Sequence, residues 1–226
     1  MTLFPDLMPA FLNFHAHRAA VSPAEAVVRN LVLPLQEPDE AEKFAGSPFS
    51  AGIHPWYIPA RTDEALAELD RLASCPSCVA IGEAGLDKLA SASMDVQCGL
   101  FRRQALLAVA RGLPLVVHCV RAWGELLALR REFPQELVCV VHGFRGKPEL
   151  ARSLLDKGFW LSFGFRFHPQ SLALCPPDRL FLETDEDPRP VDGLYRTAAA
   201  LRGCTPEDLA TQCRENLANL ARKLKK

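Results

Sequence analysis

The chain has 226 residues, of which 49% are hydrophobic, and its formal net charge is −1 at pH 7. This length and apolar content suit one domain with a substantial core, and we expect residues 1–226 to form it. The near-neutral charge excludes a global basic field for gripping a nucleic-acid duplex or an anionic membrane, so any polyanion must bind locally.

The first residues lack a basic start followed by an apolar segment, and no run of about 18 uncharged apolar residues occurs. We therefore expect a soluble, cytoplasmic protein with no membrane association and no obligate protein partner. Eight cysteines are scattered along the chain, unlike the dense framework of a small secreted scaffold, which predicts reduced thiols. Cys75 and Cys78 form a C-x-x-C pair with no second pair, which is weak support for a metal or redox motif.

Short apolar runs alternate with helical patterns along the chain. The apolar runs predict eight strands, at residues 11–15, 29–33, 49–53, 78–82, 115–118, 137–141, 159–163 and 179–183. Helical spacing and capping residues predict helices at 62–73, 96–111, 122–131, 148–157 and 205–224, a short turn at 171–175, and a helix that begins near 191. After the second strand, residues 38–45 leave room for only about two turns of helix.

Parallel strands with interleaved helices predict an α/β fold, a single-domain (β/α)8 TIM barrel; a doubly wound sheet is the alternative. In a TIM barrel the reactive groups lie at the carboxyl ends of the strands, because the loops there converge. Seven side chains follow predicted strand ends: His15, His17, His54, Glu83, His118, His142 and Asp185.

These residue types predict a metal site. Imidazole and carboxylate are ligands that zinc, manganese and related cations accept, and a bound cation makes water a nucleophile at neutral pH. The two-residue spacing of His15 and His17 puts both imidazoles on the same side of a strand. A single histidine is more often a hydrogen-bonded core or surface residue, so the prediction depends on the whole set.

Six motifs in order, spanning nearly the whole chain, resemble those of the TatD family of metal-dependent hydrolases. They are His15-Ala16-His17, Gly52-Ile53-His54-Pro55, Ile81-Gly82-Glu83-Ala84-Gly85-Leu86-Asp87, Pro114-Leu115-Val116-Val117-His118-Cys119-Val120-Arg121, Val141-His142-Gly143-Phe144-Arg145-Gly146 and Glu183-Thr184-Asp185. The resemblance implies a TIM barrel, two divalent cations, and cleavage of phosphodiester bonds, commonly in DNA.

The resemblance also implies a set of ligands for these cations: His15, His17, Glu83, His118, His142 and Asp185. His15 and His17 would serve one cation, His118 and His142 the other, and Glu83 both. Asp185 would bind the first cation and help to orient or deprotonate the attacking water, so Glu83 and Asp185 are the predicted catalytic residues. Zinc, manganese and magnesium all remain open as the metal.

Several other side chains are candidates for substrate contact. Arginines follow strand ends at positions 18, 121, 145, 166 and 189, and guanidinium groups bind phosphate in bidentate fashion. We expect Arg121 and Arg145 to contact phosphate and His54 to touch substrate or a neighbouring group, whereas pairing with loop carboxylates is the alternative for each arginine. Trp56 and Phe144 could stack on unpaired bases, or pack between loops and helices.

The chain departs from the family pattern at two places. Asn13 stands where the family usually has an aspartate, and the loop after Asp185 omits a long segment that contacts substrate in relatives. Both departures concern contacts to metal or substrate, so they bear on nuclease activity more than on hydrolysis in general. We expect a DNase that uses a metal-activated water, an exonuclease on single-stranded DNA, with a smaller phosphodiester as the other possible anionic substrate. Two alternatives remain: a hydrolase of another ester or amide that uses the same bimetal centre, and a non-catalytic barrel that acts as a binding module.

Overall fold

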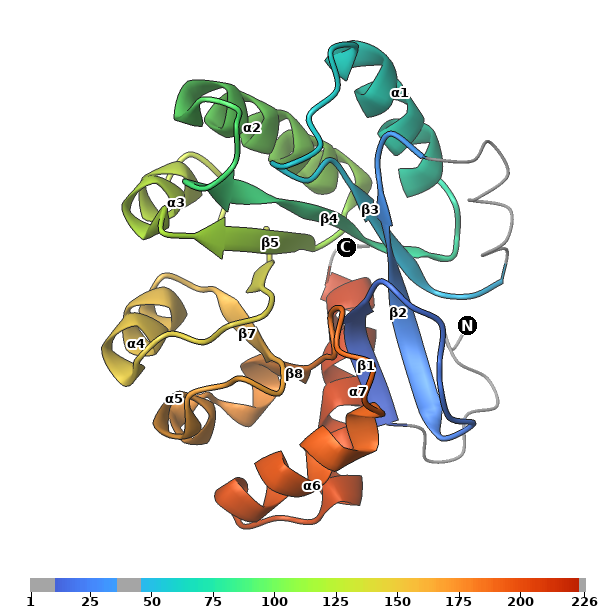
Figure 1. Cartoon of the computed structure of the whole chain (residues 1–226), viewed down its shortest axis with the longest axis vertical. Helices are drawn as coiled ribbons and strands as arrows, with labels where there is room; N and C mark the ends of the chain where they lie inside the picture. Colours follow the sequence, from blue (N-terminus) through green and yellow to red (C-terminus); the bar gives the residue numbers. More distant parts are fainter. Residues whose placement is uncertain (1–10, 36–45, 224–226) are drawn as a thin grey trace. The chain divides into compact units, whose positions relative to one another are not determined.

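The computed structural model describes residues 11–35 and 46–223, and Figure 1 shows its helices and strands. The strands are β1 (Phe11–Ala16), β2 (Glu25–Val32), β3 (Phe49–Gly52), β4 (Cys78–Asp87), β5 (Leu115–Val120), β6 (Cys139–Val141), β7 (Trp160–Phe163) and β8 (Leu180–Leu182). The helices are α1 (Thr62–Ala73), α2 (Met94–Arg111), α3 (Trp123–Arg130), α4 (Pro148–Asp156), α5 (Pro169–Leu174), the 3-10 turn η2 (Pro177–Arg179), α6 (Val191–Arg202) and α7 (Pro206–Lys223). The helical turns predicted at 38–45 lie outside the described residues.

The strands follow one another in the sheet in chain order, from β1 to β8. The pairs β1–β2, β3–β4, β4–β5 and β7–β8 are parallel. The chain beyond β8 returns to β1, because Ala16 forms a parallel bridge with Asp185. This order, with helices in the connections, is that of the (β/α)8 TIM barrel and confirms the predicted fold class. It excludes the doubly wound alternative, in which the strand order reverses at a switch point.

The chain divides into two compact units, and the boundaries between them fall within β2 and β6. Among the described residues, the first unit comprises 11–29 and 141–223, and the second comprises 30–35 and 46–140. The prediction of a single domain stays a prediction.

Aromatic side chains fill the core of the first unit. Phe14 of β1 stacks on Phe181 of β8, with ring centroids 3.9 Å apart. The buried Tyr195 of α6 donates its hydroxyl to the carbonyl of Leu12, at 2.8 Å, so the helix is tied to the strand that leads to the first histidines. A capping hydrogen bond from the Asp208 amide to the Thr205 hydroxyl, at 3.1 Å, starts α7 where the sequence predicts.

In the second unit the helices fix the ends of the strands. Helix α1 has the predicted bounds and buries Leu66, Leu69 and Leu72 on one face. Gln104 of α2 bonds both backbone groups of Ile53: its Oε1 accepts from the Ile53 amide at 2.8 Å, and its Nε2 donates to the carbonyl at 3.0 Å. Ile53 precedes His54, so this side chain holds the backbone that carries a predicted site residue.

Two strands extend by several residues beyond their predicted bounds, whereas β1 and β5 run only slightly past theirs, to Ala16 and Val120. Strand β2 begins at Glu25 instead of 29, and β4 continues to Asp87 instead of ending at Gly82. Both additions contain buried carboxylates, which break the apolar run that marks a strand in sequence. Strand β4 also comes close to β5 at Gly85, where a Cβ would lie 2.0 Å from the carbonyl oxygen of His118, so only glycine fits. Within the described part of the chain, no helix is long and apolar enough to cross a membrane.

Candidate metal centre

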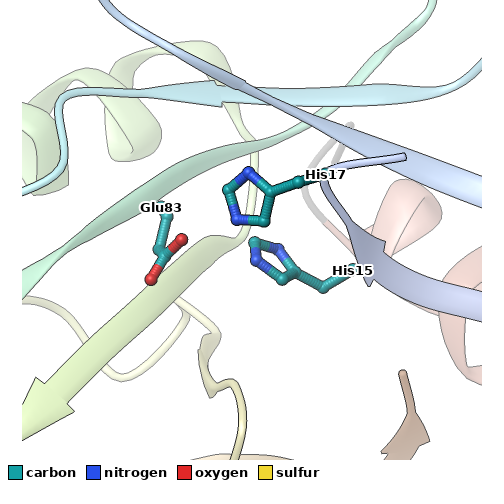
Figure 2. A group of neighbouring side chains, drawn as sticks. All are labelled: His15, His17 and Glu83. Carbon is teal, nitrogen blue, oxygen red and sulfur yellow. The ribbon is translucent and has the colours of Figure 1, made fainter. Parts of the chain in front are cut away.

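The first unit holds one group of donor atoms, which we call the first donor group: His15, His17, His142 and Asp185. His15 and His17 extend from the end of β1, and their rings lie beside each other in Figure 2, with centroids 5.3 Å apart. Asp185 Oδ1 lies 3.5 Å from His17 Nε2 and 3.9 Å from His15 Nε2. Donor atoms of His15, His142 and Asp185 lie within 4.8 Å of one another.

The backbone at Asp185 helps to aim its carboxylate. Asp185 has a φ of +57°, in the left-handed region that costs a non-glycine residue on the order of 1–2 kcal/mol. Hydrogen bonds to β1 hold this conformation: the Asp185 amide donates to the His15 carbonyl at 3.0 Å, and the His17 amide donates to the Asp185 carbonyl at 3.2 Å. The backbone that presents the two histidines therefore also positions the aspartate.

The second unit holds the second donor group: His54, Glu83 and His118. His54 follows β3, Glu83 lies in β4 and His118 lies in β5. Glu83, which Figure 2 also labels, is buried and has its Oε1 at 2.7 Å from His118 Nδ1 and 3.2 Å from His54 Nε2. Asn30 accepts from the Glu83 amide at 3.0 Å and has its Nδ2 3.5 Å from Glu83 Oε2, which orients the carboxylate.

Each donor group has a further carboxylate behind one histidine. Asp87 Oδ2 lies 3.1 Å from His118 Nε2, and Glu183 Oε1 lies 3.2 Å from His142 Nδ1. A carboxylate on the far ring nitrogen fixes the tautomer and orientation of a metal-binding histidine and raises its basicity. This is the arrangement expected of histidines that bind metal.

The surroundings of these two carboxylates favour their charged forms. Burial alone would raise the pKa of Glu183, but hydrogen bonds with His142 and Ser162 hold it below its ordinary value. The pKa of Asp87 is likewise lowered: burial opposes the shift, and hydrogen bonds from the Leu89 amide, His118 and Trp56 outweigh it. Neither carboxylate was predicted as a site residue. For Asp87 the signal was its even spacing from Glu83, since alternate residues of a strand share a face.

The predicted substrate contacts differ in their surroundings. Arg121 and Arg145 are exposed, and no hydrogen bond or ion pair involves their side chains within the part of the chain that is described. Arg18, in contrast, is bound to Glu25 and to backbone carbonyls, and Arg189 pairs with Asp187 at 2.7 Å. Arg18 and Arg189 therefore pair with carboxylates of the chain, which was the stated alternative to phosphate binding.

Two other expectations are resolved by burial. Trp56 is 53% exposed, whereas Phe144 is buried and packs against Phe163, so stacking of Phe144 on a base is excluded. All eight cysteines are free thiols, and burial raises the pKa of the Cys119 thiol to about 12. A cysteine beside His118 with such a pKa carries almost no thiolate at neutral pH, so it is not a nucleophile.

The donor sets fit divalent cations. In each donor group, the nitrogens of two histidines and one carboxylate oxygen lie within 4.8 Å of one another, which suits zinc, manganese and related ions. With a (β/α)8 fold, these groups define the class of metal-dependent hydrolases.

Comparisons with known proteins agree with this class. The family model "TatD related DNase" matches residues 35–222. The "3'-5' ssDNA/RNA exonuclease TatD" of Cronobacter turicensis is 37% identical over 67% of this chain and 63% of its own length, so this alignment spans less than two thirds of that relative. The "Uncharacterized metal-dependent hydrolase YabD" of Bacillus subtilis is 30% identical over 88% of this chain and 89% of its own.

Among solved structures, the TatD homolog YJJV from Escherichia coli K12 superposes with a TM-score of 0.80, at 21% identity, over 94% of this chain and 98% of its own. This likeness supports the fold. The chain belongs to the TatD-related DNase family of metal-dependent hydrolases.

Proposed function

We propose that this protein is a metal-dependent phosphodiesterase that removes nucleotides from single-stranded DNA. The observation that carries the proposal is the presence of two imidazole–carboxylate donor groups, each with a histidine backed by a further carboxylate. Two divalent cations, zinc, manganese or magnesium, would be held by His15, His17, Glu83, His118, His142 and Asp185, with Glu83 shared between them. His54 belongs to the second donor group by distance, and we propose that it also contacts substrate.

A divalent cation at such donors polarises water and neutralises charge on a phosphate. The chain's own residues accept the proton, bind the phosphate and orient the ligands. Asp185 accepts the proton of the attacking water, since its carboxylate is half-exposed and lies beside His17. Arg121 and Arg145, which are exposed and not engaged in ion pairs among the described residues, bind non-bridging phosphate oxygens. Asp87 and Glu183 hold the rings of His118 and His142 in orientation.

Trp56 supports a single-stranded substrate. Its indole is 53% exposed, yet Nε1 donates to Asp87 Oδ2 at 2.6 Å and its backbone amide donates to His54 Nδ1 at 3.1 Å. The ring is therefore fixed in orientation while its surface is available, and unpaired bases stack on such surfaces without sequence preference. The relatives named 3'-5' ssDNA/RNA exonuclease support the same substrate class. A cytoplasmic location and action without an obligate protein partner remain predictions.

The test is a nuclease assay with and without Mg²⁺ or Mn²⁺ on single-stranded DNA labelled at either end. We expect metal-dependent release of nucleotides, abolished in Glu83→Gln and in Asp185→Asn. Glu132→Gln is the matched control, because it removes a carboxylate of an exposed ion pair with Arg102. Full activity in both site variants would refute the proposal. Turnover of small carboxylic esters or amides in place of DNA would favour the alternative hydrolase, and absence of turnover on all substrates would favour the binding module.

A further inference from the structure

Glu25 is a buried carboxylate at the first residue of β2, and it lies outside both donor groups. It is only 7% exposed, and its oxygens accept from three residues. Asn13 Nδ2 donates at 2.7 Å, the Arg18 guanidinium donates to both oxygens at 3.2 Å, and the Val21 amide donates at 2.9 Å. A buried carboxylate with this many donors is satisfied only if all of them keep their places.

The donors of Glu25 reach the segment that carries Asp185. Asn13, which is fully buried, donates to the Thr184 hydroxyl at 2.8 Å and accepts from the Thr184 amide at 2.9 Å. Arg18 donates to the Asp187 carbonyl at 3.2 Å and to the Arg189 carbonyl at 2.9 Å. One carboxylate thus fixes the backbone on both sides of Asp185.

The same donors flank the two histidines of β1. Asn13 precedes His15 by two residues and shares its face of the strand, and Arg18 directly follows His17. Because the His15 and His17 backbones also bond Asp185, the relative placement of these three ligands depends on the segments that Glu25 joins.

We propose that Glu25 is a positioning residue for the first donor group, acting through Asn13 and Arg18. It sets the distances between His15, His17 and Asp185 without touching them, and so sets the affinity of this group for a divalent cation. The inference relies on the proposed function only in taking these three residues as ligands. The role of Glu25 also explains why Asn13, and not an aspartate, occupies position 13. An aspartate there would bring its carboxylate within hydrogen-bonding distance of the Glu25 carboxylate, and the two negative charges would repel each other.

The experiment measures binding of Mn²⁺ to the metal-free protein by calorimetry, with no nucleic acid present. Glu25→Gln keeps the shape but removes the charge that holds Arg18, and Asn13→Asp replaces the donor with a repelling acceptor. We expect each to weaken Mn²⁺ binding by about 10-fold or more, the range seen for residues that orient ligands. Glu132→Gln, which breaks an arginine–carboxylate pair far along the chain, should bind as the wild type does.

The double variant, Asn13→Asp with Glu25→Gln, exchanges donor and acceptor across the same hydrogen bond and restores the net charge of the cluster. We expect it to recover part of the Mn²⁺ affinity that either single variant loses, because the hydrogen bond between positions 13 and 25 forms again while the Glu25 oxygen that Arg18 Nη2 also uses is not restored. Such non-additivity is shown only by coupled neighbours. It also decides the matter if a single variant does not fold. Unchanged affinity in Glu25→Gln, or a double variant as weak as the single ones, would overturn the inference. A different outcome would refute only the proposed function: the single variants lose Mn²⁺ affinity as expected, but the wild type shows no nuclease activity.

Discussion

Glu183 offers the sharpest separation of structural from functional effects, through two substitutions at one buried position. Its side chain is fully buried and accepts from the Gly143 amide at 2.7 Å, lies 3.2 Å from His142 Nδ1, and accepts a short hydrogen bond from the Ser162 hydroxyl. Both Gly143 and His142 bond the same oxygen, Oε1. The Ser162 hydroxyl, on Oε2, can rotate to a new partner.

Glu183→Ala should be strongly destabilising. It leaves the part-buried Gly143 amide and the buried His142 ring nitrogen without their acceptor, at about 1–3 kcal/mol for each donor, so we expect a loss of about 2–6 kcal/mol in the free energy of unfolding. Glu183→Gln keeps a carbonyl oxygen for both donors and an amide that can donate to Ser162. It should therefore cost about 1 kcal/mol.

The functional effect should run differently. Glu183→Gln removes the negative charge behind His142, so we expect metal affinity or turnover to fall about 10- to 100-fold although the fold persists. Urea unfolding of the metal-free protein measures the first effect, and Mn²⁺ calorimetry with the nuclease assay measures the second. Equal stability losses in the two variants, or wild-type metal affinity in Glu183→Gln, would refute the reasoning.

The remaining predictions concern substrate, packing, mechanism and pH. Trp56→Ala should raise KM for single-stranded DNA about 5- to 150-fold with a smaller change in kcat, and Trp56→Phe should retain most of the affinity, as steady-state kinetics would show. Gly85→Ala should unfold at a clearly lower temperature in a calorimetric scan, because its methyl group would meet the His118 carbonyl. Cys119→Ala should leave turnover at neutral pH unchanged, since a thiol with a pKa of about 12 takes no part in the chemistry; a large loss would mean otherwise. The hydrogen bond from Arg102 lowers the pKa of Glu132 in the folded protein. The stabilisation by this ion pair is therefore present at pH values above the ordinary pKa of glutamate and is lost as the pH falls through the lowered pKa. The difference in Tm between the wild type and Glu132→Gln should shrink over that pH range.

The fold could be predicted because apolar periodicity records which face of an element is buried. Helix α1 has its predicted bounds, and all eight strands occur in the predicted order, since apolar runs and leucine spacing are local properties. The largest errors in the predicted bounds lie where the local signal is polar. Strand β2 starts early at Glu25 and β4 continues through Asp87, and in both places a carboxylate is buried by partners distant in sequence.

The prediction of site residues fails at the same kind of position, where a polar group is buried by partners distant in sequence. Pattern and resemblance select the donor residues, because their spacing relative to strand ends is visible in the sequence. They do not select Asp87, Glu183 or Glu25, since an acidic residue reads as a solvated surface group unless its partner is known. The distinction between Arg18, which is bound to Glu25, and Arg121, which is exposed, is invisible for the same reason: both follow a strand end.

The substitution at position 13 shows why single positions are a poor guide to function here. In sequence, Asn13 suggests a missing carboxylate and hence a weakened metal site. In the structure, that side chain is buried between Glu25 and Thr184 and uses both its donor and its acceptor, so a carboxylate is present in the same network, one hydrogen bond further from the histidines. An amide and a carboxylate that exchange places keep the net charge of the cluster and the hydrogen bond between them, although Arg18 Nη2 then loses the oxygen that it shares with Asn13. The loss of an acidic residue at this position therefore gives no reason to expect an inactive protein, and the paired variants at Asn13 and Glu25 test that equivalence directly.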